Sequence, residues 1–303
     1  MAALEARADI RLSVITEPAY TSQYRVTTSV RTVPDVKDFD AVRGAAFDIL
    51  RERPPVGVVV PSERALPTGG YLRTCLALPG SGFDVATAFS DKYVMKRRLS
   101  EAGVPVAAFR LATRAADVPA AAAALGWPVV VKPLRGSGSV GWPDSTPRRP
   151  GSRPEPALVE SFVRVSGEYH CDGVVHDGET VFASVSQYFA PLLGRRPDRA
   201  GSVSVPTDAP EHAPIVDLHR RVIRALGLRA GVTHLEVYRT DTGFVVGRSP
   251  VARAGADRRP RRRAPRVDLW DALLRTSSVT NRCSRRVRCP VSRRTCGFRC
   301  GSG

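Results

Sequence analysis

A lysine within an apolar run precedes a glycine-rich segment near the middle of the chain. Lys132 lies in WPVVVKPL (127–134), and GSGSVG (136–141) begins four residues after it. An apolar run of this length predicts a buried strand, which gives the ammonium group of Lys132 a fixed direction. Glycine backbones approach phosphate oxygens closely and present their N–H groups to them. The segment is therefore a candidate phosphate site, with loop residues Gly136, Ser137, Gly138 and Ser139.

The same loop matches G-x-G-x-x-G, the pattern of dinucleotide-binding turns. That pattern requires a helix to begin at the loop, so that the helix N-terminus faces a pyrophosphate. Here WPDSTP (142–147) follows, and a segment with two prolines cannot begin a long amphipathic helix. A Walker A loop is excluded as well, because no Gly-Lys-Ser/Thr follows. Neither nucleotide motif is therefore assigned to the loop.

Lysine is rare in this chain, which makes each lysine informative. Only four of the 46 basic residues are lysines, namely Lys37, Lys92, Lys96 and Lys132. Such a bias is typical of GC-rich coding sequences, so the remaining lysines are candidates for positions that require a compact ammonium group. Lys92 begins a predicted helix, capped by Asp91. Lys96 lies one turn later, and we expect it on a solvated face.

Three further segments carry polar groups suited to a nucleotide and its metal ion. The run LVESFV (158–163) predicts an edge strand whose backbone can pair with an adenine edge, and Glu168 follows within reach of ribose hydroxyls. Glu236, in THLEV, offers a strand carboxylate of the kind that Mg²⁺ prefers. Without the order of the motifs, both glutamates are better explained as exposed strand residues.

The histidines and the internal cysteines carry no metal-site pattern. His170, His176 and His234 lack the spacing typical of a zinc site, so we expect them to be structural or solvated. Cys75 and Cys171 are expected to be buried, unreactive thiols.

The elements that position these residues alternate between strands and helices. Periodicity predicts helices over 36–52, 92–102, 115–125 and 214–227, and strands over 10–15, 55–61, 106–112, 127–134, 157–163, 168–175 and 180–189, followed by a hairpin of 231–240 with 243–247. The strand–helix–strand order over 10–61 predicts a right-handed crossover in a Rossmann-like sheet. Its loops 61–64 and 69–82 are expected at the carboxyl edge, where ligands bind.

The order of the motifs resembles the ATP-grasp superfamily. DKYVMK, GWPVVVKPLRGSGSVG, LVESFVRVSGEY and THLEVYRT occur in the superfamily's order, and residues 69–106 look like the pre-ATP-grasp junction of bacterial carboxylate–amine ligases, including amino-acid ligases. The resemblance implies an α/β fold. A Rossmann-like pre-ATP-grasp domain is expected over 1–90, a two-lobed α+β ATP-grasp domain over 91–277, and an Arg/Cys-rich unpatterned tail over 278–303.

The resemblance also implies a role for each candidate residue. Lys92 and Lys132 would hold the α- and β-phosphates of ATP, beneath a lid formed by Gly136, Ser137, Gly138 and Ser139. The nucleoside would be held by Glu160, Phe162, Val163 and Glu168, of which the first three line the adenine hinge and the last binds the ribose. Glu236 would be a Mg²⁺ ligand, and Arg253 would be the catalytic arginine.

The implied reaction joins a small-molecule carboxylate to an amine. ATP transfers its γ-phosphoryl group to the carboxylate, and the amine attacks the resulting acylphosphate, while Mg²⁺ and cationic side chains neutralise the developing charge. The implied protein is a cytoplasmic ligase with ATP and Mg as cofactors, and a homodimer is one assembly open to it.

The pattern departs from the family after residue 247. Members carry a second metal-binding glutamate before the arginine, but Ser249, four residues before Arg253, and Arg248 have no carboxylate. A degenerate ATP-binding protein without turnover is therefore an alternative. On this interpretation ATP binds but little ADP is released, unless another carboxylate such as Asp257 completes the site.

Most of the positive charge lies at the same end of the chain. The net charge is +17, and residues 247–303 contribute +13 through 16 arginines, no lysine and three aspartates. One interpretation is a basic tail that binds nucleic acid or a membrane surface. The other is out-of-frame translation of a GC-rich message, which the sudden loss of lysine, glutamate and periodicity favours. We therefore do not expect nucleic acid as a partner.

Two further observations exclude other classes. The tail cysteines do not form C-x₂-C pairs, which excludes a zinc knuckle at Cys283, Cys289, Cys296 and Cys300. The chain contains no run of about 18 apolar residues, so no membrane-spanning helix is predicted. The first residues do not resemble a secretory signal.

Overall fold

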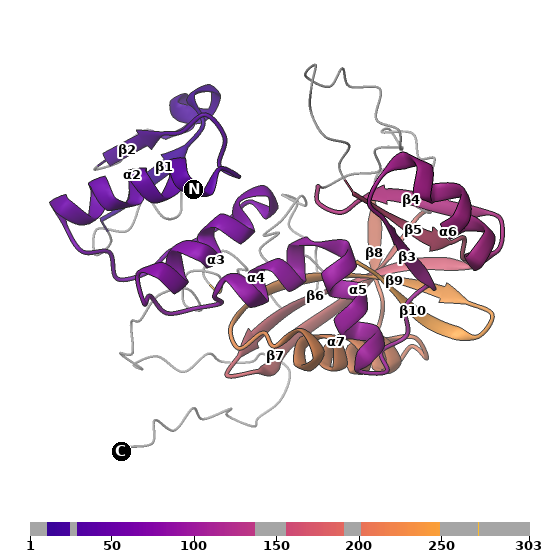
Figure 1. Cartoon of the computed structure of the whole chain (residues 1–303). Coiled ribbons are helices and arrows are strands. Elements are labelled where there is room, and N and C mark those ends of the chain that lie inside the picture. The colour runs from indigo at the N-terminus through magenta and orange to yellow at the C-terminus, as the bar shows by residue number, and fades with distance from the viewer. Residues whose placement is uncertain (1–10, 25–28, 137–155, 191–200, 249–271, 273–303) are drawn as a thin grey trace.

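The computed structural model describes residues 11–24, 29–136, 156–190, 201–248 and 272. Figure 1 shows a central sheet covered by helices, with a small two-stranded unit on one side and a three-stranded sheet with its own helix on the other. The fold is of the α/β class, as expected.

The N-terminal unit pairs two short parallel strands beside one helix. Strand β1 (Ser13–Thr16) lies in register with β2 (Ser29–Thr32), and the short helix η1 (Pro18–Gln23) lies between them in sequence. Helix α2 (Phe39–Glu52) buries Val42 and Ala46, at the spacing that predicted it. It begins at Phe39, three residues after the predicted start, because the carboxylate of Asp38 accepts the N–H groups of Asp40 and Ala41.

The predicted strand over 55–61 is wrong. These residues form no strand, because Pro55 and Pro61 have no N–H to donate and the guanidinium of Arg73 binds the carbonyl of Val58 (Nη2–O 2.6 Å). Strand β2, which periodicity did not predict, pairs with β1 in the position expected for residues 55–61. The apolar character of the segment comes instead from Val60, which is buried in the large core.

The predicted ligand-binding loop over 69–82 is wrong as well. After the turn η2 (Glu63–Ala65), helix α3 (Leu66–Cys75) contains Gly69 and Gly70, and helix α4 (Phe83–Ser90) follows. These glycines permit close packing and do not form a turn. A Cβ atom at Gly69 would lie 2.1 Å from Val60, and one at Gly70 would lie 2.5 Å from Ala86.

The central sheet is antiparallel and has two unlike faces. Its strand order is β10-β9-β6-β7-β8, with β6 (Gly167–His176), β7 (Glu179–Tyr188), β8 (Ser202–Ser204), β9 (Gly231–Thr240) and β10 (Gly243–Arg248). Because side chains alternate along each strand, Cys171, Leu235 and Val237 share one face, which packs against helices. The covering helices are α5 (Lys92–Glu101) and α7 (His212–Leu226), both close to their predicted positions.

The small sheet has the order β3-β5-β4, all antiparallel. Its members are β3 (Phe109–Ala112), β4 (Val129–Pro133) and β5 (Ala157–Ser161), and it is accompanied by the turn η3 (Ala115–Asp117) and α6 (Val118–Leu125). The prediction that LVESFV forms an edge strand is wrong. Strand β5 lies in the centre, with Glu160 opposite Phe109 on one side and Val130 on the other.

Backbone bonds and one large core join the parts. The N–H of Val246 donates to the carbonyl of Pro105, and that of Lys92 donates to Leu134, both at 2.9 Å. The core contains Val60 and Phe89 together with residues of α7 and the central sheet. The division of the chain at residue 90 stays a prediction. Within the described ranges, the search for a bilayer-spanning helix finds no candidate.

Candidate active site

A buried carboxylate holds two lysines at the junction of the two sheets. Oε2 of Glu160, on β5, lies 2.7 Å from Nζ of Lys132 on the neighbouring β4, and Oε1 lies 3.3 Å from Nζ of Lys96 on α5. The side chain of Glu160 is only 4% exposed and that of Lys96 only 1%. The expectation that Lys96 lies on a solvated face is therefore wrong. Periodicity within α5 did not reveal the long-range partner that makes this burial possible.

Lys92 lies beside this pair at the start of α5. Its ammonium group donates to the carbonyls of Pro133 (2.9 Å) and Gly136 (3.2 Å). Burial, and then the charge of Lys132, lower the pKa of Lys92 to about 8. Asp91 fixes this position, because its carboxylate accepts the N–H groups of Tyr93 and Val94. The structure thus brings Lys92 to the first residue of the glycine loop, and the charge of Lys132 lies close enough to lower the pKa of Lys92.

Gly136 is the meeting point of two cationic side chains from distant elements. Besides Lys92, Arg248 of β10 donates to its carbonyl (2.9 Å) and forms an ion pair with Glu63 of η2. Gly136 has a φ of +120°, which favours glycine at this position. The positive charge of Arg248 is thereby paired with the carboxylate of Glu63.

The polar face of the central sheet lies on the side away from the helices. Glu168 is opposite Tyr238, and Glu236 is opposite His170 on one side and Arg248 on the other. Glu168 is buried, so its interpretation as an exposed strand residue is wrong, and Glu236 is partly buried. Burial, followed by the charges of Glu236, Glu168 and Glu160, raises the pKa of Tyr238 well above its ordinary value.

The predicted adenine segment follows β5 directly. The N–H of Phe162 donates to the carbonyl of Pro128 (3.0 Å), and the phenyl ring is 45% exposed. Val163 is half-buried. The remaining predicted site residues, Ser137, Gly138, Ser139 and Arg253, lie outside the described residues.

Sequence reasoning missed a polar cluster on the same sheet face. His170 and Asp172 of β6 meet His234 of β9, and their candidate ligand atoms all lie within 4.8 Å of one another. Burial acts to raise the pKa of Asp172, but the two imidazoles lower it well below its ordinary value. The sequence does show that residues 170 and 172, two apart on a predicted strand, share one face. Only the β6–β9 register reveals that His234 lies opposite Asp172.

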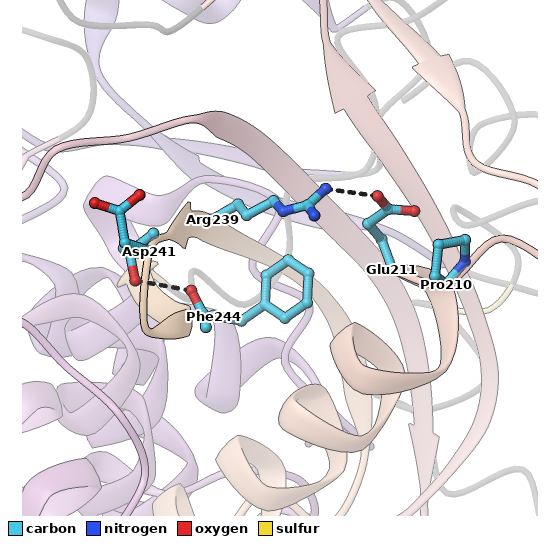
Figure 2. A pocket seen from close by; sticks show the side chains of 7 residues that line it. Pro210, Glu211, Arg239, Asp241 and Phe244 are labelled. Carbon is cyan, nitrogen blue, oxygen red and sulfur yellow. Dashed lines mark hydrogen bonds and ion pairs between the residues drawn. The ribbon is translucent and has the colours of Figure 1, made fainter.

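The two thiols in the described part of the chain and one surface pocket are not among the groups that form this junction. Cys171 is buried, and burial raises the pKa of its thiol, whereas Cys75 is exposed, contrary to expectation. Figure 2 shows a pocket at the β9–β10 hairpin, where Arg239 binds Glu211 at 2.7 Å and Phe244 lines the wall. None of the predicted site residues lines this pocket.

The donor set at the junction fits a magnesium nucleotide. Two ammonium groups and a glycine backbone suit phosphate oxygens, and a carboxylate on the adjacent sheet suits Mg²⁺. One buried oxygen, Oε1 of Glu160, makes no hydrogen bond within the described part of the chain.

Comparisons with known proteins agree with this chemistry. No family model matches the chain. Among curated proteins, the L-arginine-specific L-amino acid ligase of Bacillus subtilis is 32% identical over 290 residues, which cover 90% of this chain and 70% of that protein. An uncharacterised protein, y4rH, of Sinorhizobium fredii is 30% identical over 227 residues, covering 70% of this chain and 46% of that protein.

Solved structures share the fold at lower identity. The L-amino acid ligase of Bacillus licheniformis has a TM-score of 0.63 at 19% identity, over 81% of this chain and 67% of that one. The carboxyaminoimidazole ribonucleotide synthase of Aspergillus clavatus, solved with ATP, has a TM-score of 0.68 at 15% identity, over 88% and 70%. On the strength of the Bacillus subtilis relative, the chain belongs to the L-amino acid ligases of the ATP-grasp superfamily.

Proposed function

We propose that this ATP- and magnesium-dependent carboxylate–amine ligase joins two L-amino acids at the junction of the two sheets. The observation that carries the proposal is the convergence of Lys92, Lys132 and Gly136 beside the polar sheet face that bears Glu236. These residues come from three separate elements and one loop, and the electrostatic effect of Glu236 on Lys92 supports their proximity.

The lysines and the loop would bind the phosphates. Lys132 keeps 27% of its side chain exposed, so its ammonium group can reach a ligand. When a phosphate oxygen binds Lys132, Glu160 still has Lys96 as its partner, which limits the cost of separating the first pair. Gly136, Ser137, Gly138 and Ser139 would close over the phosphates through their backbone N–H groups.

Glu236 would hold the metal ion, and the segment after β5 would hold the nucleoside. When bound, ATP supplies the phosphoryl group that activates the carboxylate. The residues at the nucleoside would be Glu160, Phe162, Val163 and Glu168, with Glu168 at the ribose. Arg253 would neutralise charge on the transferred group.

The named relative guides the choice of substrates. Because the Bacillus subtilis protein is described as L-arginine-specific, arginine is the first substrate to test. We also propose that the ligase works in the cytoplasm, where ATP is supplied. Its assembly as a homodimer stays a prediction.

The proposal is tested by measuring ADP release together with the product. The purified chain is supplied with Mg-ATP and pairs of L-amino acids, with arginine in the first set, and dipeptides are identified by mass spectrometry. We expect ADP and dipeptide in equal amounts, and Glu236→Gln should abolish both. ATP binding without amino-acid-dependent ADP release would instead support the degenerate alternative, which the family membership does not favour.

The phosphate assignment is tested by ATP binding alone. Lys132→Met should weaken the ATP affinity at least tenfold, as expected for the loss of a charge-assisted phosphate contact. Lys37→Met is the matched control, because Lys37 is exposed and pairs only with Asp35 among the interactions described. Equal affinities for ATP in the two variants by calorimetry would contradict the role of Lys132.

A further inference from the structure

The cluster of His170, Asp172 and His234 has the composition of a metal site. Nδ1 of His234 lies 2.6 Å from Oδ1 of Asp172, and Nδ1 of His170 lies 3.1 Å from Oδ2. Both imidazoles therefore turn the same ring nitrogen toward one carboxylate. Two imidazoles and one carboxylate are a ligand set that proteins use for zinc, iron and related divalent ions.

The outer nitrogens of the two imidazoles are held by hydroxyl groups. Nε2 of His170 lies 3.0 Å from Oγ of Ser202, and Nε2 of His234 lies 3.3 Å from the hydroxyl of Tyr188. A histidine that binds a metal ion through one nitrogen typically donates its other N–H to an oxygen, which fixes the ring and its tautomer. Ser202 and Tyr188 provide such oxygens, and both come from strands other than those of the ligands.

One nitrogen of the cluster lacks a hydrogen bond. Nδ1 of His170 is buried and makes no hydrogen bond within the described part of the chain, although it faces Asp172. The side chain of His170 is 9% exposed, so water cannot readily satisfy this nitrogen. Its contact with Oδ2 of Asp172 at 3.1 Å is the separation expected of two atoms that bind one cation between them.

We propose that His170, Asp172 and His234 bind one divalent transition-metal ion of the zinc, cobalt or nickel class. Imidazole nitrogens favour these ions over Mg²⁺, which prefers oxygen ligands. Asp172 is 26% exposed, which leaves an approach for the ion and for a water ligand to complete its coordination.

The site is separate from the carboxylate proposed for magnesium but borders it. His170 lies directly opposite Glu236 in the β6–β9 register, and His234 is two residues from Glu236 on the same strand. A transition-metal ion would therefore lie on the same polar face as the nucleotide metal. The inference does not depend on the proposed ligase reaction, because it concerns metal binding alone.

Calorimetric titration with zinc and cobalt tests the site in the full chain. Mg²⁺ is kept in large excess, so that the carboxylate site is not measured. We expect one strong equivalent of either ion, and we expect His234→Gln and Asp172→Asn to weaken that binding at least tenfold. His176→Gln is the matched control, since His176 lies at the end of β6, the strand that carries Asp172, and is about half exposed. It should bind the ion as the wild type does.

Spectroscopy of the wild type keeps the proposal testable if a variant fails to fold. The cobalt-loaded chain should show visible bands of a nitrogen and oxygen site without a thiolate charge-transfer band, and X-ray absorption of the zinc-loaded chain should show two imidazole ligands. Sulfur ligands would instead place the ion at cysteines. Either that result or wild-type binding equal to that of His234→Gln would overturn the proposal.

Discussion

Glu160 illustrates how a single buried residue organises the site. Its carboxylate is shared by two lysines from different elements, so that the charges of Lys96 and Lys132 can approach each other next to a phosphate site. Burial lowers the pKa of Lys96, and the charge of Glu160 opposes this effect. A buried ion pair stabilises little in itself, but the loss of one partner leaves a buried charge without compensation.

This asymmetry predicts an order among the variants. Glu160→Gln should destabilise the fold by about 3 kcal/mol, because it leaves Lys96 charged and buried. Lys96→Met should cost less, since Glu160 keeps Lys132 as a partner. Urea denaturation of both variants measures the two free energies of unfolding. A larger loss for Lys96→Met than for Glu160→Gln would contradict this account.

Lys92 should make stability depend on pH. Its pKa is about 8 in the folded chain and near 10.5 in the unfolded chain, so the unfolded chain binds more protons between these values. The contribution of Lys92 to stability should therefore rise with pH from about 8 to 10.5. We expect the free energy of unfolding of the wild type, minus that of Lys92→Met, to increase by about 2–3 kcal/mol over this range. A difference independent of pH would exclude the lowered pKa.

At the scale of elements, the site depends on a sheet with one apolar and one polar face. The hairpin of β9 and β10 and the strands β6 and β7 could be predicted from alternation, and helix α7 from its apolar stripe. The contacts between elements could not be predicted. The central place of β5 and the meeting of His170 with His234 depend on strand register, which local patterns do not encode.

The failures at the N-terminal end have a different physical cause. Gly69 and Gly70 suggested a loop, but in α3 Gly69 allows the segment that contains Val60 to approach closely and Gly70 allows α4 to do so. Prolines at both ends of 55–61 prevented a strand in a segment whose composition favoured one. Tertiary packing decided the first case, and the missing N–H groups of the prolines decided the second.

The start of α5 determines where Lys92 lies, which leads to a prediction at this scale. Asp91→Ala removes the side-chain cap and should destabilise the protein by about 1 kcal/mol. ATP affinity should fall as well, because Lys92 is the first residue of the helix. Asp84→Ala is the control, since Asp84 is exposed and its pair with Arg98 should contribute less than about 1 kcal/mol. Thermal unfolding and calorimetry check the two effects, and equal losses in both variants would contradict the capping role.

At the scale of the whole molecule, part of the segment after residue 247 still matches the family. The match to the Bacillus subtilis ligase covers 90% of the chain, whereas residues 1–247 are only about four fifths of it. The match therefore extends past residue 247. Ala272 is helical and packs against the large core. Both observations favour a native reading frame for at least part of this segment.

The uneven distribution of charge leads to the last prediction. Residues 249–303 carry 15 arginines, whereas the part before residue 247 is nearly neutral. Nonspecific binding of DNA arises from neutralised phosphates, and its affinity falls steeply with salt. We expect that a chain ending at Arg248 loses whatever salt-dependent DNA binding the full chain has at low salt. A full-length variant in which five arginines become glutamine serves as the charge control and should show a shallower salt dependence; the replaced residues are Arg258, Arg259, Arg261, Arg262 and Arg263. Fluorescence anisotropy with labelled DNA measures both, and an unchanged salt dependence in the shortened chain would place the binding surface on the folded body instead.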